Sequence, residues 1–379
     1  MSYNPIKPIL DYSTKNGIAH GAFNVNMPSQ AEDIIKALER IRSAAIIQVA
    51  EPGLAFIGGN TNFIQGTMEE KKIGAKRIAK AVKKMAANTT IPVCLHLDHG
   101  RSYESCKLCI DAGFSSVMID GSSLPYEENV ALARKVTKYA HRHGVSVEAE
   151  LGVLAGVEDD VFAMNSTYTD PMLVVDFFKR TNVDSLAISY GTKHGAVKGD
   201  NVKLRKEIAI ASMENLRHAL IQGNLVSHGS SLVPQYIVGE INELGGKVSG
   251  HGIPMEQLKE VIPAGISKIN MDTDIRLATF RNVLEYFKKN PEKQTSKIYQ
   301  LILAKPENFD YRYYLTPIME QIVNGAKDTE ESLVMKKLMA QAIDEIVIPA
   351  SVNFGDVGDS DFIERKSLEE MKNIYKNNL

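Results

Sequence analysis

Short apolar runs alternate with amphipathic segments along most of the chain. Runs rich in β-branched residues, typical of buried strands, occur at 19–25, 44–50, 91–99, 115–120, 145–150, 185–190, 224–228 and 266–270. A helical pattern follows each run, as at 30–40, where Ser29 is the expected cap, and at 69–87, after an expected loop at 52–62. Eight strand-then-helix units over about 270 residues predict an α/β protein, a (β/α)8 TIM barrel. A doubly wound sheet is the alternative, but the sequence has no dinucleotide-binding glycine fingerprint.

The pattern changes near residue 278, after which only helical periodicity remains. Helices are expected at 280–289, 296–304, 313–327 and 331–346. We therefore expect a barrel over residues 1–278 and a helical extension over residues 279–379. The extension would pack on the barrel or on a second subunit.

Composition excludes several classes of function. The 379 residues carry a formal net charge of -2, which gives no basic surplus for nucleic acid or a membrane surface. The first ten residues lack the order of a signal peptide. The three cysteines, Cys94, Cys106 and Cys109, then fit a reducing, cytoplasmic setting. Cys106-x-x-Cys109 resembles half of a zinc site, but without a second pair a structural role is favoured.

Polar and ionisable residues gather where the predicted strands end. The carboxyl ends of barrel strands form the active-site face of this fold. The residues at these ends are Asn24, Asp98-His99, Asp120, Glu150, His194, His228 and Asn270-x-Asp272. Scattered surface polarity would not follow strand ends, so the sequence predicts a site on this face.

Three His-Gly pairs indicate a metal. His99, His194 and His228 each precede a glycine and follow strands three, six and seven. Three imidazoles with an open fourth position make a catalytic zinc site. Asp98 would then be a proton carrier beside the metal, unless Asp98-His99-Gly100 is only an exposed turn. Of the other histidines, His96 is expected to pack inside and His141 and His143 to be solvated.

Candidate acidic residues and candidate phosphate-binding residues also follow the predicted strands. Glu158-Asp159-Asp160 follows strand five, either as a loop acid that moves a carbon-bound proton or as a plain solvated turn. The amides of Gly229-Ser230-Ser231, between a strand and a helix, can cradle an anion. Lys198 and Arg276 flank the same corner, where this fold often binds phosphate. A substrate with phosphate at one or both ends is indicated.

The chain resembles the class II, metal-dependent fructose-1,6-bisphosphate aldolases over roughly residues 5 to 320. The motifs that carry the resemblance are 22–26 (AFNVN), 97–100 (LDHG), 116–122 (SVMIDGS), 147–152 (VEAELG), 191–195 (GTKHG), 228–231 (HGSS) and 270–276 (NMDTDIR), in family order. The resemblance implies reversible cleavage of fructose 1,6-bisphosphate to dihydroxyacetone phosphate and glyceraldehyde 3-phosphate through a zinc-stabilised enediolate.

The resemblance also implies residue roles. Zinc would be held by His99, His194 and His228, with Glu150 near a second metal position. Asp98 would exchange the C4 hydroxyl proton, Glu158 the carbon-bound proton, and Asn270 would lie near the enediolate. The implied substrate- and phosphate-binding residues are Asn24, Gly195, Lys198, Gly229, Ser231, Asp272, Thr273 and Arg276. A monovalent cation (K+ or Na+) and a homodimer or homotetramer are also implied.

Three positions depart from the family pattern. Ala50 replaces a serine that touches substrate, Ala155 replaces a loop glycine, and Thr316 stands where one branch places an arginine in trans. Arg276 compensates for Thr316, because the other branch uses that position. Ala50 leaves tagatose 1,6-bisphosphate or another phosphorylated ketose as an alternative substrate. A metal-dependent hydrolase or isomerase and a non-catalytic scaffold are the other classes considered.

Overall fold

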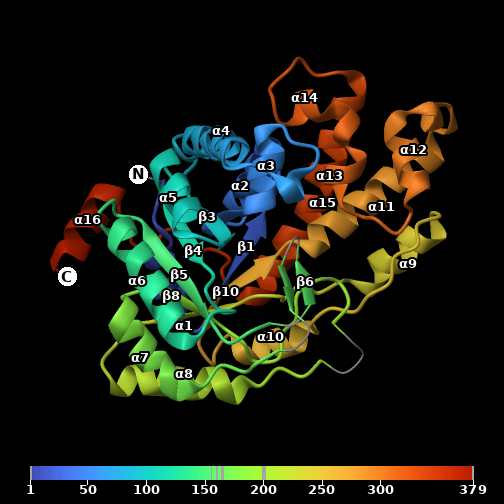
Figure 1. Ribbon diagram of the computed structural model, residues 1–379. Helices are drawn as coiled ribbons and strands as arrows, with labels where there is room; N and C mark the ends of the chain where they lie inside the picture. Colours follow the sequence, from blue (N-terminus) through green and yellow to red (C-terminus); the bar gives the residue numbers. More distant parts are fainter. Residues whose placement is uncertain (1, 155, 159–160, 164–165, 199–201, 378–379) are drawn as a thin grey trace.

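The computed structural model describes residues 2–154, 156–158, 161–163, 166–198 and 202–377, with the backbone alone at 157–158, 161–163 and 377. Eight parallel strands close into a barrel in the order β1-β10-β9-β8-β5-β4-β3-β2 (Figure 1). They are β1 (His20–Asn24), β2 (Ala45–Ala50), β3 (Val93–Gly100), β4 (Ser116–Ile119), β5 (Ser146–Leu151), β8 (Ser185–Ile188), β9 (Asn224–Ser227) and β10 (Ile266–Met271). The predicted TIM barrel is confirmed.

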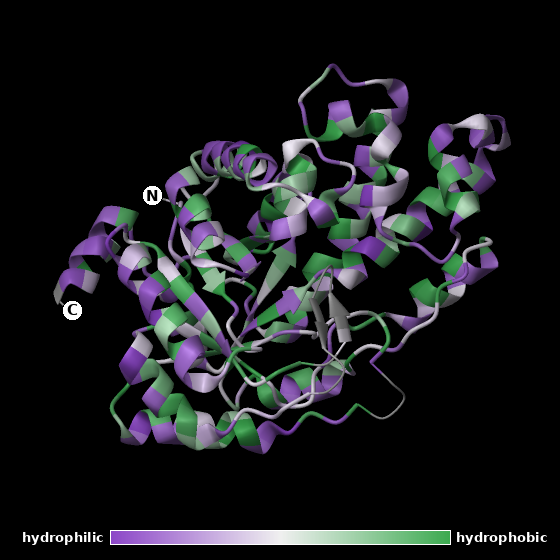
Figure 2. Cartoon of the chain, in the orientation of Figure 1, coloured by the Kyte–Doolittle hydropathy of each residue, from purple (hydrophilic) through white to green (hydrophobic). Residues whose placement is uncertain are grey.

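Helices surround the barrel. They are α1 (Ile6–Asn16), α2 (Pro28–Arg40), α3 (Glu51–Gly58), α4 (Met68–Ala86), α5 (Tyr103–Ala112), α6 (Tyr126–His141), α7 (Pro171–Thr181), α8 (Lys206–His218), α9 (Gln235–Glu243), α10 (Met255–Val261) and α11 (Thr273–Lys289). Figure 2 shows hydrophilic and hydrophobic residues alternating along these helices. This is the pattern from which the helices were predicted.

The remaining helices form the C-terminal extension. They are α12 (Lys297–Ala304), α13 (Tyr311–Tyr314), α14 (Met319–Ile322), α15 (Glu330–Phe354) and α16 (Leu368–Asn377). α15 packs on α11 and α2, and α16 reaches round to α6. The predicted boundary at residue 278 falls inside α11, and one apolar core runs from the barrel helices into α15.

Several predicted elements were wrong in detail. The expected loop at 52–62 contains α3, which Pro52 opens at a first-turn position. The cap of α2 is Met27 and not Ser29. The helix expected at 313–327 is broken into short pieces around Pro317, because proline removes a backbone donor. The helix expected to end at 346 continues to Phe354, and β6 (Gly156–Glu158) and β7 (Val161–Ala163) form a hairpin that was not predicted.

The N-terminal end of the barrel is closed by an apolar plug. Ile6, Ile9 and Leu10 of α1 pack against Ala22, Ile46 and Cys94 of the strands, together with Ile363 of the C-terminal segment. The opposite end has polar residues, so it is the end where a site can open. No described helix has both the length and the apolar character that crossing a membrane requires.

Candidate active site

The last residues of β3 bring an acid and an imidazole to one place. Pairing between β3 and β4 shifts between Leu97 and Gly100, and His99 has a left-handed φ of 46°. This irregularity lets Asp98 and His99 serve one site although successive strand residues point to opposite faces. A Cβ on Gly100 would lie 2.4 Å from the carbonyl oxygen of Met118, so glycine is required there.

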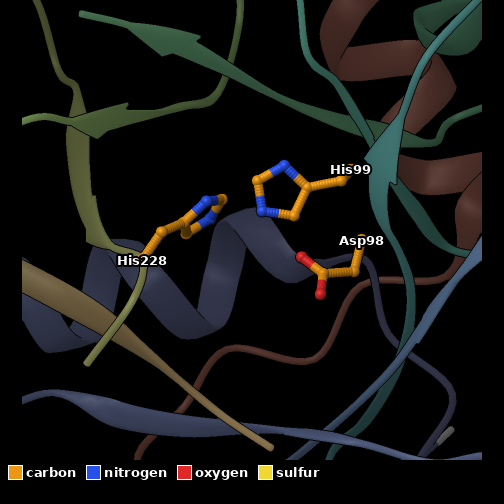
Figure 3. Close-up of side chains that lie close together, drawn as sticks. All are labelled: Asp98, His99 and His228. Atoms are coloured by element: carbon orange, nitrogen blue, oxygen red, sulfur yellow. The ribbon is translucent and has the colours of Figure 1, made fainter. Parts of the chain in front are cut away.

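Three side chains converge at the mouth of the barrel. Asp98, His99 and His228 place ligand atoms within 4.8 Å of one another. Figure 3 shows these three side chains lying close together. The ring centroid of His99 lies 4.7 Å from that of His228 and 5.2 Å from that of His194. His194 belongs to neither compact group found in the described chain, but its ring is adjacent to His99. The structure therefore gathers all three predicted histidines.

Amide side chains orient Asp98, which is fully buried. Asn24 donates to its Oδ2 at 2.8 Å and Asn270 donates to its Oδ1 at 3.1 Å. Gln48 donates to Asp98 Oδ2 at 3.3 Å and to the side-chain oxygen Oδ1 of Asn24 at 2.6 Å. These donors stabilise a carboxylate acceptor and fix its direction. Gln48 was not predicted as a site residue, although its place two residues before Ala50 on β2 puts it on the same strand face.

A carboxylate holds one nitrogen of His99. His99 Nδ1 lies 3.0 Å from Asp120 Oδ2, which leaves Nε2 as the nitrogen that an ion would use. Burial raises the pKa of Asp120, but the hydrogen bonds from His99 and Ser122 outweigh it and hold the pKa well below its usual range. His99, Asp120 and Glu150 form a second compact group of possible ligands.

His228 is held in the same way from deeper in the barrel. Its Nε2 lies 2.9 Å from Glu148 Oε1, and Lys268 donates to both oxygens of Glu148 at 3.2 and 2.9 Å. Burial raises the pKa of Glu148, but Lys268 and His228 hold it well below its usual range. Burial opposes a charge on His228, yet Glu148 and Glu150 raise its pKa to about 9. The side chains of Glu148 and Lys268 are fully buried.

The donor set fits a divalent metal. His228 Nδ1 and Glu150 Oε2 lie 3.1 Å apart, yet each is a buried atom without a hydrogen bond of acceptable geometry. Two ligands bound at about 2.1 Å and about a right angle lie about 3 Å apart, so one ion would satisfy both atoms. Imidazoles with carboxylates suit a transition metal.

The predicted substrate-binding residues line one cavity of about 200 Å³. These residues are Asn24, Gly195, Lys198, Gly229, Ser231, Asp272, Thr273 and Arg276, together with Asn270. Asp274, which prediction missed, accepts the backbone N–H groups of Leu232 and Val233 and so holds the loop after β9.

The C-terminal extension completes this cavity. Arg276 donates at 2.9 Å to Asp272, the residue just before its own helix, and at 2.9 Å to Asp310 in the extension. Asp310 also accepts from the buried Arg312, and the two arginines hold the Asp310 pKa well below its usual range against the effect of burial. Phe309 joins the cavity wall. Distant chain segments thus fix the direction of Arg276.

Other predicted features have mixed outcomes. Glu158 lies at the end of β6, but its side chain is outside the described residues, as are Ala155, Asp159 and Asp160. Gly156 forms a bridge with His194, which places the β6–β7 hairpin beside the site. His141 was expected to be solvated and is not: it is buried 2.9 Å from Asp184 and stacks on Tyr375 of α16. Because α16 covers this position, helix periodicity alone could not reveal its burial.

Comparison with known proteins assigns the family. The family model described as "Fructose-bisphosphate aldolase class-II" matches residues 4–336. The chain belongs to this family. It is therefore an aldolase, a carbon–carbon lyase, for which the family implies a divalent metal and a phosphorylated sugar substrate.

Named relatives agree with this assignment. A fructose-bisphosphate aldolase of Treponema pallidum (strain Nichols) is 39% identical over 330 residues, covering 83% of this chain and 91% of its own. One of Giardia intestinalis is 36% identical over 374 residues, covering 98% of each chain. Among solved structures, a fructose-bisphosphate aldolase from Campylobacter jejuni matches with a TM-score of 0.66 at 23% identity, covering 94% of this chain and 96% of its own. At that identity the structural likeness concerns the fold.

Proposed function

We propose that the chain is a zinc-dependent aldolase that cleaves fructose 1,6-bisphosphate to dihydroxyacetone phosphate and glyceraldehyde 3-phosphate. The observation that carries this proposal is the buried carboxylate of Asp98, which Asn24 and Asn270 orient directly beside the imidazoles of His99 and His228. An acid held next to a metal site can exchange a hydroxyl proton while the metal stabilises developing charge.

The metal site is assigned to His99, His194 and His228, with Glu150 at a second position that the ion can occupy. When bound, zinc would act as a Lewis acid toward the carbonyl group of the ketose and favour negative charge next to it. Asp120 and Glu148 support this role because each holds one ring nitrogen of a ligand histidine.

The chain's own residues would move two protons. As the C3–C4 bond of the ketose breaks, Asp98 accepts the C4 hydroxyl proton and the C4 carbon leaves as an aldehyde. Glu158 then delivers a proton to C3, which becomes the hydroxymethyl carbon of dihydroxyacetone phosphate. Asn270 donates toward the oxygen that gains charge and keeps Asp98 in position.

The two ends of the substrate would occupy different corners of the cavity. Gly195, Lys198, Gly229 and Ser231 would bind one phosphate, with a monovalent cation (K+ or Na+) beside it. Arg276 would bind the other phosphate, and Asp272 and Thr273 would orient the carbon chain between them. Amide cradles and a fixed guanidinium are typical phosphate ligands.

Tagatose 1,6-bisphosphate or another phosphorylated ketose remains the alternative substrate, favoured by Ala50. A homodimer or homotetramer, working in the cytoplasm, is part of the same proposal. The sequence of β1 argues against a metal-dependent hydrolase or isomerase, because β1 ends in Asn24 and offers no pair of metal-binding histidines near that end.

The test measures cleavage of fructose bisphosphate before and after chelation, with zinc added back. We expect a chelator to abolish cleavage and zinc to restore it, while borohydride added with substrate traps no adduct. A borohydride-trapped lysine adduct would contradict the metal mechanism. Parallel assays with tagatose bisphosphate separate the substrate assignment from the chemistry, since turnover of that sugar alone would keep the aldolase reaction and overturn the fructose assignment.

A further inference from the structure

Three buried hydroxyl groups form a chain that ends on the loop after β9. Tyr190 Oη is hydrogen-bonded to Ser227 Oγ, which lies 2.6 Å from Ser230 Oγ. Ser230 Oγ in turn donates to the carbonyl oxygen of His228 at 3.2 Å. Tyr190, Ser227 and Ser230 are all fully buried, and none of them takes part in the proposed reaction. Hydroxyls joined in this way inside a protein fix the backbone to which they are attached.

The hydroxyl chain has one direction. Among the residues that the structure describes, Tyr190 Oη has Ser227 Oγ as its one partner, so the phenol proton points there. Ser227 then donates to Ser230, and Ser230 donates to the His228 carbonyl oxygen. Each of the three protons has an acceptor in this arrangement, whereas a reversal at Ser227 would leave the phenol proton buried and unpaired. Burial raises the pKa of Tyr190 and so keeps the phenol protonated.

The hydroxyl chain joins the loops that carry two of the predicted zinc ligands. Tyr190 lies two residues after β8 and four residues before His194, whereas Ser227 ends β9 directly before His228. The two loops also touch at Gly229, which has a φ of 59° and where a Cβ would lie 2.4 Å from the carbonyl oxygen of Lys193. Tyr190 therefore holds the second loop from the neighbouring strand of the barrel.

Buried side chains hold the loop after β9 at both ends. The hydroxyl chain fixes its start, and Asp274 fixes its far end by accepting from the amides of Leu232 at 3.1 Å and Val233 at 2.6 Å. Between these points Gly229 and Ser231 line the candidate phosphate cavity. A cradle of backbone amides binds an anion well only if its N–H groups already point at the anion. The hydroxyl chain thus acts on the part of the loop that would bind phosphate.

We propose that Tyr190 is a positioning residue, whose hydroxyl acts through Ser227 and Ser230 to hold the 228–231 loop in its phosphate-binding shape. This role rests on the proposed function, in which Gly229 and Ser231 bind one phosphate of the ketose. The phosphate takes no part in bond cleavage, so it is bound about equally in the substrate and in the transition state. Loss of uniform binding raises KM and leaves kcat unchanged. The ring of His228 is held separately by Glu148, so zinc should stay bound.

Tyr190→Phe, which removes only the hydroxyl, tests this role in the zinc-loaded enzyme. We expect KM for fructose 1,6-bisphosphate to rise about fivefold, the effect of one lost hydrogen bond, with kcat within about twofold and zinc content unchanged. The matched control is Tyr375→Phe, since Tyr375 is also buried and its hydroxyl lies 3.1 Å from Ser146, but in α16. The control should leave KM unchanged. Equal KM values for the two variants, or a fall in kcat without a rise in KM, would overturn the role.

Ser230→Ala interrupts the other end of the hydroxyl chain and leaves the backbone amide in place. If the three hydroxyls act as one unit, KM in the double variant with Tyr190→Phe should equal that of the more affected single variant. Independent losses of about fivefold each would instead multiply to about 25-fold. A multiplied loss would show that Tyr190 does not act through Ser230 and would overturn the proposal.

Binding of inorganic phosphate, measured by calorimetry, tests the loop without turnover. Arg276→Ala is the background, because it removes the other predicted phosphate corner. We expect Kd to rise about fivefold when Tyr190→Phe is added. An unchanged Kd would overturn the role of Tyr190 even if fructose bisphosphate is cleaved. A fivefold rise in a protein whose wild type does not cleave the sugar would overturn the proposed function and leave the role of Tyr190 standing.

Discussion

Asn24 and Asp98, 74 residues apart, are joined by a 2.8 Å hydrogen bond at the mouth of the barrel. The bond connects the end of β1 to the end of β3 across the intervening β2. This bond holds the carboxylate of Asp98 in place beside the histidines. Catalysis by that carboxylate should therefore depend on amides that carry no charge themselves.

Replacing Asp98 by Asn should remove the proton carrier while keeping the shape of the site. We expect kcat for fructose bisphosphate cleavage to fall by about 10²–10⁴, the usual contribution of general acid–base catalysis. Zinc content, measured in parallel, should stay at the wild-type value. Loss of zinc together with activity would instead assign Asp98 to the metal.

Asn24→Ala tests the orientation of that carboxylate. We expect kcat to fall by about 10–100-fold, as for other residues that orient a catalytic group, with zinc content again unchanged. Asn353→Ala, which removes an exposed amide of α15, is the control and should leave kcat alone. Equal rates for Asn24→Ala and the control would mean that Asn270 and Gln48 are enough to orient Asp98.

Arg276→Lys should separate the two phosphate corners. The guanidinium is held between Asp272 and Asp310, a geometry that a lysine ammonium cannot reproduce. We expect KM for fructose 1,6-bisphosphate to rise at least about tenfold, with little change for fructose 1-phosphate. Equal losses with both sugars would place Arg276 outside the second phosphate site.

Ala50→Ser tests the substrate. Ala50 pairs in register with Asp98 on the neighbouring strand, so a hydroxyl there would lie beside the Asp98 carboxylate. A gained hydrogen bond of about 1 kcal/mol would lower KM for fructose bisphosphate about fivefold. If the variant instead gains only with tagatose bisphosphate, the fructose assignment is the one to abandon.

The Glu148–Lys268 pair should make the stability of the protein depend on pH in the acid range. Because its folded pKa is depressed, Glu148 contributes stability above its unfolded pKa of about 4.3, which is lost as the pH falls below that value. Glu148→Gln with Lys268→Met removes the pair without leaving one charge buried. Urea unfolding of zinc-free protein should show that the free energy of unfolding falls less between pH 7 and pH 3.5 in the variant than in the wild type. Parallel losses in both proteins would contradict this account.

The sequence by itself determined the barrel and most of the site. Continuous apolar runs and helices of period 3.6 set the eight units. Parallel strands bring their carboxyl ends together, which gathered Asp98, His99, His228 and Asn270. Lys268 and Glu148 lie two residues before Asn270 and Glu150 and therefore share their strand faces. A shared face, however, does not show which charged side chains meet.

Only the tertiary structure decided the contacts between distant segments. Three features depend on packing between elements far apart in sequence. They are the register shift in β3 that brings His99 beside Asp98, the contact of Asp310 with Arg276, and the burial of His141 under Tyr375. The meeting of His20 with Asp359 is of the same kind. Local periodicity reports which face of an element is covered, and the fold alone reports what covers it.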